Sequence, residues 1–333
     1  MTTEQTEQTE KSEKPQKSVT FENLNLNTRI LDALDKKGYK EPTPVQRESI
    51  PVLLGGKDLL ATAQTGTGKT AAFSLPILHM LTEREPRKKG SIRALVLTPT
   101  RELALQVDQS CRTYGSYLRS KTSVILGGVS MKGQIKSLQR KPDILVATPG
   151  RLLDLIGQGF IKLDNVEMLV LDEADRMLDM GFIHDVRKIV KQTPQARQTM
   201  LFSATLSPEI MRFAADMLQD PQTVSVTPPA SVSVNIEQKV LFVEQTDKRK
   251  LLADVLKDKA VSRALVFART KRHADHLVKQ LEKNGISADA IHSNKSQNAR
   301  QKALAAFDRG RIKVLIGTDI VARGIDVDRK SVV

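Results

Sequence analysis

The stretch KDLLATAQTGTGKT (57–70) joins a short apolar run to a glycine-rich turn, with a lysine where a helix would begin. Gly66 and Gly68 allow backbone N–H groups to point toward phosphate oxygens, because glycine adopts positive φ readily. Lys69 supplies positive charge for the β- and γ-phosphates, and the hydroxyl of Thr70 can bind Mg²⁺. The stretch therefore predicts a buried strand, a phosphate-binding loop and a helix in succession.

A second stretch, EMLVLDEAD (167–175), is an apolar run that ends in an acidic cluster. It places Asp172 and Glu173 at the end of a predicted strand, where phosphoryl transfer needs a metal ligand and a water-activating base. Alone, the glycine-rich run could be an ordinary turn and the acidic run a solvated face. Because both follow apolar strands in this order, together they predict a nucleotide-hydrolysing site. Ala63 is a departure, since it replaces the first glycine of GxxxxGK[ST].

The composition suits two domains of ordinary size and a polyanionic partner. The 333 residues are 40% hydrophobic and carry a net charge of +14 at pH 7. Residues 235–333 hold 21 Lys and Arg against 12 Asp and Glu. This charge favours a nucleic acid partner, although it could be only a solubility trait. Aromatic residues make up 4% and tryptophan is absent, so we expect contacts to phosphates and sugars to dominate over base stacking.

Cysteine usage and apolar runs bear on location. The single cysteine, Cys111, excludes an internal disulfide and fits a reducing cytoplasm, and we expect it to be a buried residue. No apolar run reaches the roughly 18 residues of a membrane span. The start, MTTEQTEQTE, is polar and acidic, unlike a secretory signal or a transit peptide. We therefore expect a cytoplasmic protein without a membrane segment, and we also expect it to be a monomer.

Apolar runs that end in polar clusters recur along the chain and alternate with helical patterns. In order they are DLLATA (58–63), ALVLTPT (94–100), ILVATPG (144–150), MLVLDEA (168–174), TMLFSAT (199–205), RALVFART (263–270), DAIHSN (289–294) and KVLIGTD (313–319). This alternation predicts parallel sheets covered by helices on both faces, with ligands at the carboxyl ends of the strands. TPPAS (227–231) interrupts the pattern, so we expect an α/β protein of two doubly wound units in tandem.

The order of short motifs resembles that of the DEAD-box ATP-dependent RNA helicases, in particular their bacterial branch. The motifs are FENLNL (21–26), GYKEPTPVQ (38–46), AQTGTGKT (63–70), PTRELA (99–104), GG (127–128), TPGR (148–151), DEAD (172–175), SAT (203–205), VFART (266–270), QNAR (297–300) and TDIVARGID (318–326). The resemblance implies two RecA-like domains, the second incomplete. We expect a disordered tail at 1–18, an ATP-binding domain at 19–225, a linker at 226–234 and a partial second domain at 235–333.

The resemblance also implies an ATP and Mg²⁺ site. Gln46 would read adenine through its side-chain amide, and Phe21 would stack on the base, although it could be an ordinary core aromatic. Asp172 would order Mg²⁺, largely through water, and Glu173 would orient or deprotonate the attacking water. The remaining expected ATP contacts are Ala63, Gln64, Thr65, Gly66, Thr67, Gly68, Lys69, Thr70 and Asp326, with Lys69 also catalytic and Thr70 also a metal ligand. Asp175 would bond with Ser203 and Thr205 and link the state of ATP to domain closure.

An RNA site is implied by the same resemblance. Its expected residues are Arg101, Gly128, Thr148 and Arg151 in the first unit and Arg269, Thr270, Gln297, Arg300 and Thr318 in the second. Hydroxyls, strand-end amides and arginines suit phosphates and sugars, although each arginine could be only a surface ion pair. The preference for RNA over DNA rests on the resemblance alone, because spacing does not reveal contacts to a 2′-hydroxyl.

The family pattern continues to a motif resembling HRIGRTGR, whose arginines reach the γ-phosphate, and this sequence ends at Val333 without it. We therefore expect ATP binding but poor hydrolysis, since such arginines contribute on the order of 10³–10⁵ in rate.

Four functions remain open from the sequence. The leading one is an RNA-stimulated ATPase, a hydrolase acting on ATP that separates short duplexes or remodels RNA–protein complexes, with ribosomal particles among the possible partners. The second is a non-catalytic, ATP-gated RNA clamp, and ATP hydrolysis separates the two. A DNA translocase is opposed by the DEAD spelling and the adenine-reading glutamine. A plain P-loop kinase or transporter ATPase leaves the second unit unexplained.

Overall fold

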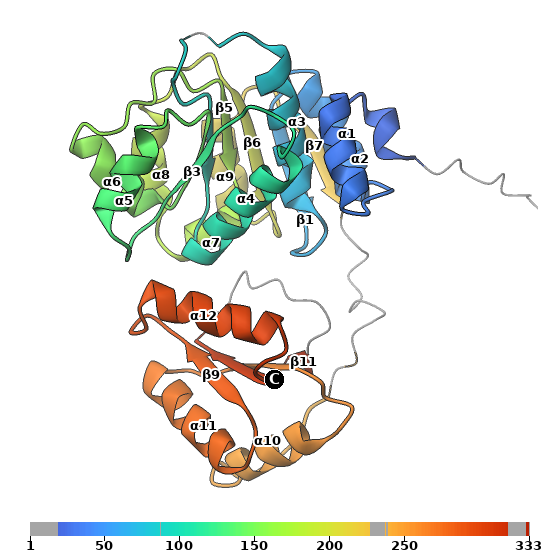
Figure 1. Ribbon diagram of the computed structural model, residues 1–333, viewed down its shortest axis with the longest axis vertical. Coiled ribbons are helices and arrows are strands. Elements are labelled where there is room, and N and C mark those ends of the chain that lie inside the picture. Colours follow the sequence, from blue (N-terminus) through green and yellow to red (C-terminus); the bar gives the residue numbers. More distant parts are fainter. Residues whose placement is uncertain (1–18, 87, 227–236, 238, 319–330, 333) are drawn as a thin grey trace, which may run out of the picture.

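The computed structural model describes residues 19–86, 88–226, 237, 239–318 and 331–332, which form two α/β units (Figure 1). The predicted tail at 1–18, TPPAS, nearly all of the predicted linker and Asp326 lie outside the described residues. Among the described residues, none of the helices combines the length and the apolar character needed to cross a membrane.

The first unit alternates strands with helices, as the sequence predicts. It begins with a short 3-10 helix and two α-helices before the first strand. Its elements are η1 (Phe21–Leu24), α1 (Thr28–Lys36), α2 (Pro44–Leu54), β1 (Leu59–Ala63), α3 (Lys69–Glu83), β2 (Ala94–Leu97), α4 (Arg101–Tyr114), β3 (Thr122–Ile125), α5 (Met131–Leu138), β4 (Ile144–Ala147), α6 (Pro149–Gly157), β5 (Met168–Leu171), α7 (Ala174–Asp179), α8 (Ile183–Val190), β6 (Gln198–Ser203), α9 (Pro208–Met217) and β7 (Gln222–Val226).

The seven strands of this unit form one parallel sheet in the order β3-β4-β2-β5-β6-β1-β7. In the register, Leu59 of β1 faces Met200 of β6, and Met168 of β5 faces Gln198 of β6. The loop after β1 and the acidic run after β5 therefore leave the same edge of the sheet, with only β6 between them. The candidate site lies where these two segments come together.

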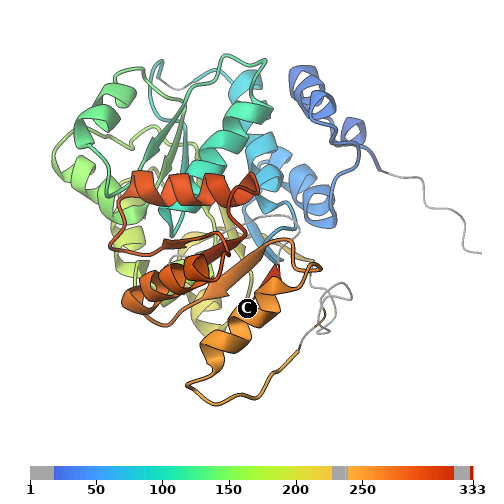
Figure 2. The ribbon, with the colours of Figure 1, turned by 60° about the horizontal axis from the view of Figure 1, so that its bottom comes forward.

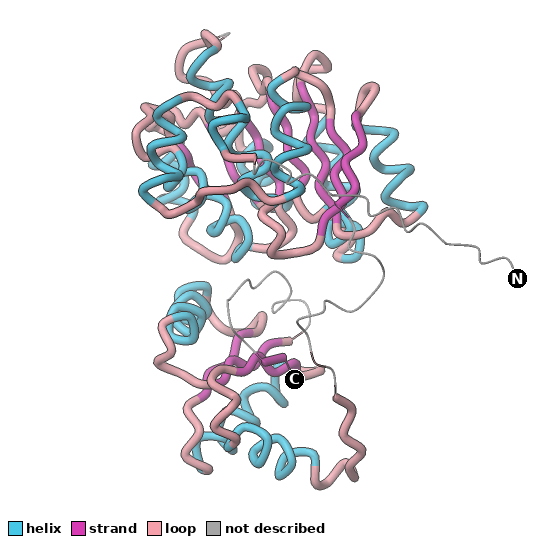
Figure 3. Tube along the Cα trace, turned by 90° about the vertical axis from the view of Figure 1, so that its right-hand side faces the viewer, coloured by secondary structure: helices cyan, strands magenta, loops and turns pink. Residues whose placement is uncertain are grey.

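The second unit is smaller and follows the same plan. Its elements are α10 (Lys248–Lys257), β8 (Ala264–Phe267), α11 (Lys271–Lys283), β9 (Ala288–Ile291), α12 (Gln297–Asp308), β10 (Val314–Gly317) and β11 (Ser331–Val332). The described strands pair in parallel in the order β11-β8-β10-β9. The tube in Figure 3 shows α12 on the side of this sheet that faces the first unit, with α10 and α11 on the other side.

Each sheet separates two hydrophobic cores, because successive strand residues point to opposite faces. In β2, Ala94 and Val96 belong to the core that also contains α3 and α4, whereas Leu95 and Leu97 belong to the core with α6 and α8. In the second unit, Leu265 of β8 packs with α12, while its neighbours pack with α10 and α11. Burial on both faces explains the near-continuous apolar runs in the sequence.

The predicted fold class is confirmed, with α/β units and parallel sheets covered on both faces. Each of the eight predicted apolar runs overlaps a strand. β3, β7 and β11 were not predicted, and each of them lies at an edge of its sheet.

Candidate nucleotide and nucleic-acid site

The glycine-rich loop links β1 to α3 as the sequence predicts. Gly66 and Gly68 have φ of 83° and 90°, the left-handed region that glycine tolerates best. Gly68 is the N-cap of α3, so Lys69 and Thr70 form its first turn. The Lys69 side chain is buried, and its Nζ donates to the carbonyl oxygen of Ala63, 2.8 Å away. The helix N-terminus and this ammonium group together favour negative charge at the loop.

Gln46 fixes the position of the loop. Its Nε2 donates to the carbonyl oxygen of Gly68 at 3.0 Å, and its Oε1 accepts from the backbone N–H of Thr43 at 3.0 Å. The predicted adenine-reading amide therefore also ties the start of α2 to the phosphate loop. A Cβ at position 68 would meet the Gln46 amide nitrogen, and φ is positive there, so this position favours glycine.

The acidic run follows β5 and is buried. Asp172 is 2% exposed, and its Oδ1 is shielded from solvent without a hydrogen-bond partner among the described residues. Glu173 has φ 54° and ψ 53°, an uncommon conformation for a residue other than glycine. Its Oε2 accepts from Arg176 Nη1 at 2.6 Å. Arg176 thus holds the carboxylate that the sequence predicts to act on water.

Burial sets the protonation of both carboxyls. Loss of solvation, and then the nearby charge of Glu173, raises the pKa of Asp172 to about 7, against the opposing effect of Lys69. Burial also raises the pKa of Glu173, while Arg176 and Lys69 oppose this shift. The two adjacent carboxyls therefore favour a cation between them and the phosphate loop.

The predicted coupling residues lie together. Asp175 Oδ2 accepts from the backbone N–H of Ala204 at 3.2 Å and from Thr205 Oγ1 at 3.5 Å. Ser203 does not bond with Asp175 directly: its Oγ donates to the carbonyl oxygen of Thr205 at 2.7 Å. The acidic run and the SAT motif therefore form one network, with Ser203 one step removed.

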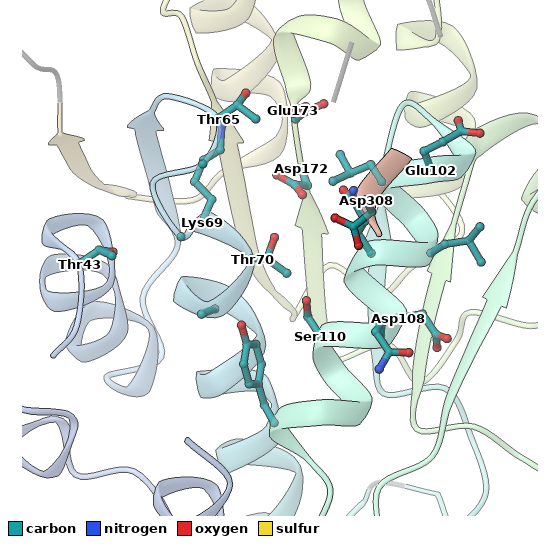
Figure 4. Close-up of a pocket in the computed structure, with 18 of the residues that line it drawn as sticks. Thr43, Thr65, Lys69, Thr70, Glu102, Asp108, Ser110, Asp172, Glu173 and Asp308 are labelled. Carbon is teal, nitrogen blue, oxygen red and sulfur yellow. The ribbon is translucent and has the colours of Figure 1, made fainter. Parts of the chain in front are cut away.

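A cavity of about 1140 Å³ joins these elements (Figure 4). In the first unit it is lined by Thr65, Gly66, Lys69, Thr70, Asp172 and Glu173, together with Gln46 and Tyr39, and in the second unit by Gln301, Leu304, Ala305 and Asp308 of α12. The cavity exceeds the usual volume of small-molecule sites, roughly 300–1,000 Å³, so a nucleotide would fit.

Two aromatic residues lie differently from expectation. Phe21 is 4% exposed and belongs to the hydrophobic core, and it does not line the cavity. Its stacking role stays a prediction, and the structure places it as a core aromatic. Tyr39, which sequence reasoning missed, lines the cavity and is 49% exposed. It lies within GYKEPTPVQ (38–46), so the sequence motif itself could have pointed to it.

The predicted RNA residues of the first unit follow the carboxyl ends of β2, β3 and β4. The guanidinium of Arg101 packs against Gly128, whose φ is 75°. Arg151 Nη1 donates to the carbonyl oxygen of Val129 at 3.3 Å, and Thr148 is the N-cap of α6. These residues therefore share one sheet edge.

In the second unit, Gln297 and Arg300 are buried in contact with the first unit. Gln297 Nε2 donates to Glu102 Oε1 at 3.0 Å, and Arg300 Nη2 lies 2.8 Å from the same oxygen. Arg101 Nη1 lies 3.5 Å from Gln297 Oε1. Sequence reasoning missed Glu102, although it is part of PTRELA.

The other predicted RNA residues of the second unit are Arg269, Thr270 and Thr318. Arg269 and Thr270 are exposed, Thr270 caps α11, and Thr318 is half-buried beside the end of β10. None of the three is buried in the contact between the units.

A Mg²⁺ site fits the donor set only together with a phosphate ligand. In the described part of the chain, no group of three or more His, Cys, Asp or Glu side chains could hold a metal ion. The unpartnered Oδ1 of Asp172 is the kind of oxygen ligand Mg²⁺ takes, since this ion binds through one or two carboxylates plus substrate phosphates and water.

Cys111 is 2% exposed, and burial raises the pKa of its thiol to about 11. The interpretation as a buried small residue is confirmed.

Replacing Gly68 should disturb the loop. Gly68→Ala should lower the free energy of unfolding by about 1–3 kcal/mol, because φ is positive and the new Cβ meets Gln46. Gly133→Ala in α5 is the control, with open space around the glycine, and it should be neutral or stabilising by up to about 1 kcal/mol. Urea unfolding measures both, and equal effects of the two changes would contradict the packing described for Gly68.

The buried Asp172 predicts a pH dependence of stability. Its folded pKa, about 7, lies above the ordinary value of 3.8, so the folded state binds more protons than the unfolded state between these pH values. This contribution to stability is present at low pH and is lost as pH rises toward 7. Asp172→Asn removes this titration. The free energy of unfolding of the variant, relative to that of the wild type, should therefore increase from pH 4 to pH 7, as measured by urea unfolding without divalent metal. A difference in the free energy of unfolding that does not change with pH would contradict the raised pKa of Asp172.

Comparisons with known proteins agree with this geometry. Residues 43–213 match the DEAD/DEAH box helicase family, and residues 247–333 match the helicase conserved C-terminal domain. The chain is 40% identical over 307 residues to the ATP-dependent RNA helicase CshA of Limosilactobacillus reuteri, covering 92% of this chain and 61% of that protein. It is 41% identical over 310 residues to CshA of Bacillus subtilis (strain 168), covering 93% and 62%. The chain thus spans about three fifths of the length of these curated relatives.

Solved structures share the arrangement. A DEAD box protein from Methanococcus jannaschii has 38% identity and a TM-score of 0.59, over 93% of this chain and 83% of that one. Saccharomyces cerevisiae Dbp5 bound to RNA and ADP BeF3 has 29% identity and a TM-score of 0.83, over 94% and 79%. Since the first family match alone spans more than half of the sequence, and both curated relatives are at least 40% identical across it, this chain belongs to the DEAD/DEAH box helicase family.

Proposed function

We propose that this chain binds ATP in the cavity between its units and hydrolyses it in response to RNA, so that hydrolysis drives separation of short RNA duplexes or remodelling of RNA–protein complexes. One observation carries the proposal. The buried Asp172 and Glu173 lie one strand away from the phosphate loop, in a cavity that α12 of the second unit helps to line.

The nucleotide would lie along the elements that line the cavity. The exposed ring of Tyr39 offers a stacking face for the base, and Gln46 offers its amide beside the loop. The backbone N–H groups of the loop and the Lys69 ammonium group would hold the phosphates. Lys69 would exchange its bond with the Ala63 carbonyl for the more favourable charged phosphate oxygens.

Thr70 and Asp172 would hold Mg²⁺, which when bound neutralises charge on the β- and γ-phosphates. Glu173 would orient the attacking water and accept its proton, since its carboxylate lines the cavity beside Asp172. Arg176 would keep that carboxylate in place through the 2.6 Å bond. Loss of solvation in this site strengthens each of these electrostatic interactions.

RNA would cross the carboxyl edges of both sheets. Arg101, Gly128, Thr148 and Arg151 share this edge in the first unit, and the exposed Arg269 and Thr270 follow β8 in the second. Such groups suit phosphates and sugars, which gives binding with little sequence preference. The solved relative that is bound to RNA and ADP BeF3 matches this chain with a higher TM-score than the Methanococcus protein does, at similar coverage, which supports a two-unit arrangement suited to both ligands.

A second candidate is an ATP-gated RNA clamp that does not turn over. Among the described residues that line the cavity, Lys69 is the only Lys or Arg, so the charge that develops on the phosphates has one cationic side chain there. Transition-state arginines contribute much of the rate in related phosphoryl transfer.

Together with the helicase function we propose a cytoplasmic location, a monomeric state and ribosomal or other RNA–protein particles as partners.

ATP turnover with and without single-stranded RNA tests the proposal. The wild-type chain should turn over faster with RNA, and Glu173→Gln should lose roughly 100-fold or more, since a general base contributes about 10²–10⁴. The same variant should still bind a fluorescent ATP analogue. The control, Glu209→Gln on the exposed surface of α9, should keep wild-type turnover.

The outcomes separate the candidates. ATP-dependent RNA binding without turnover in the wild type would favour the clamp. Neither turnover nor nucleotide-dependent RNA binding would contradict both functions.

A further inference from the structure

Helix α11 carries a line of basic side chains that the proposed ATP and RNA sites do not use. Arg272, His276, Lys279 and Lys283 are spaced four, three and four residues apart, which places them on one side of an α-helix. All four are exposed. We name this set, together with Arg249 of α10, the α11 basic stripe.

The stripe points away from the sheet. On the opposite side of α11, Ala274, Leu277 and Leu281 are buried in the core beneath β8 and β10. Figure 2 shows α11 and α10 on the lower part of the second unit, and Figure 1 places both on the far side of that unit from the first. The stripe is therefore outside the contact between the units.

Helix α10 extends the positive charge sideways. Arg249 Nη1 lies 3.3 Å from His276 Nε2, so this arginine of α10 lies beside the basic side chains of α11. Lys248 and Lys250 beside Arg249 are exposed as well. Helix α10 therefore adds positive charge next to the basic side chains of α11.

Nearby acidic residues only partly offset this charge. Asp254 of α10 pairs with Lys257 at 3.6 Å, and Asp275 of α11 binds His292 at 2.9 Å. Glu282 lies on the same helix as the stripe but on its flank, adjacent to the Asp275 side. The outward face of the two helices keeps an excess of positive charge.

The stripe is continuous with the proposed RNA path. α11 begins directly after Arg269 and Thr270, the exposed residues at the carboxyl end of β8. From Arg272 to Lys283 the helix rises about 16 Å, at 1.5 Å per residue. Stacked nucleotides repeat every 3.4 Å or so, hence this length matches roughly five of them.

We propose that the α11 basic stripe binds the phosphate backbone of the RNA segment that leaves the carboxyl edge of the sheets at Thr270. This inference rests on the proposed function and adds a second RNA contact, on the outer face of the second unit. No Phe, Tyr or Trp lies among the residues of the stripe, so we expect the contact to be mainly electrostatic and independent of sequence. It lengthens the bound RNA without changing the ATP site.

The length of the RNA distinguishes binding at the stripe from binding along the carboxyl edges of the sheets. Fluorescence anisotropy compares a 6-nucleotide and a 25-nucleotide single strand, with a non-hydrolysable ATP analogue, over a range of salt concentrations. The triple variant R272E/K279E/K283E should weaken binding of the long RNA about tenfold or more. The short RNA should bind within about twofold of wild type. For the long RNA, the slope of log K against log salt should become shallower by about 2, since three phosphate contacts contribute about 0.7 each.

The control variant is K162E/K188E/K191E, which reverses three exposed lysines on segments that lead into the amino ends of β5 and β6. Its charge change equals that of the test variant, so it measures the general effect of net charge. It should affect the two RNAs alike and only weakly. Thermal melting by circular dichroism should give wild-type curves for both variants, because all six side chains are exposed.

Equal losses for the short and the long RNA, or equal losses in the test and control variants, would overturn the stripe as a binding surface. Wild-type binding of the long RNA by the test variant would overturn it as well, while leaving the proposed function intact. If the wild-type chain binds neither RNA, the proposed function itself fails and the stripe fails with it.

Discussion

The two-unit arrangement depends on the contacts that the buried carboxylate of Glu102 makes with α12. One of the carboxylate oxygens accepts a hydrogen bond from Gln297 and forms an ion pair with Arg300, so a single group in the first turn of α4 holds α12 of the other unit. The side chains of Glu102 and Arg300 are 5% and 8% exposed, and a buried ion pair that loses one partner costs about 3–5 kcal/mol. Because α12 lies here, its residues line the cavity that begins at the phosphate loop.

The same contact links the two proposed ligands. The family resemblance implies RNA contacts for Arg101, Gln297 and Arg300, and in the structure they contact each other or Glu102. Residues of α12 that follow them line the cavity proposed to bind ATP. If binding of RNA or of ATP stabilises this contact between the units, it should also tighten binding of the other ligand, because coupling between two sites is reciprocal. Asp175, bonded to the SAT motif, connects the acidic run to a neighbouring strand end in the same way.

Much of the fold could be predicted because its central strands are buried on both faces and so appear as apolar runs. The missed strands β3 (TSVI) and β7 (QTVSV) are edge strands of the larger sheet, and their polar residues hide them in the sequence. The phosphate loop and the acidic run were predictable because their chemistry follows directly after strands. The bonds of Gln46, Glu102 and Arg176 were not, because each depends on which helices and loops meet in space. The same limit applies to Phe21, whose burial follows from packing of the first helix against the core.

The dependence of RNA affinity on nucleotide tests the central role of Glu102 most directly. RNA dissociation constants with and without a non-hydrolysable ATP analogue give the coupling between the two ligands in the wild type and in Glu102→Gln, which keeps the shape of the side chain but removes its charge. We expect the ATP analogue to lower the RNA dissociation constant of the wild type. In the variant this factor should be about tenfold smaller, a change within the usual 1–3 kcal/mol of coupling energies. Nucleotide affinity measured without RNA should change little. Undiminished coupling in Glu102→Gln would contradict the role assigned to this contact.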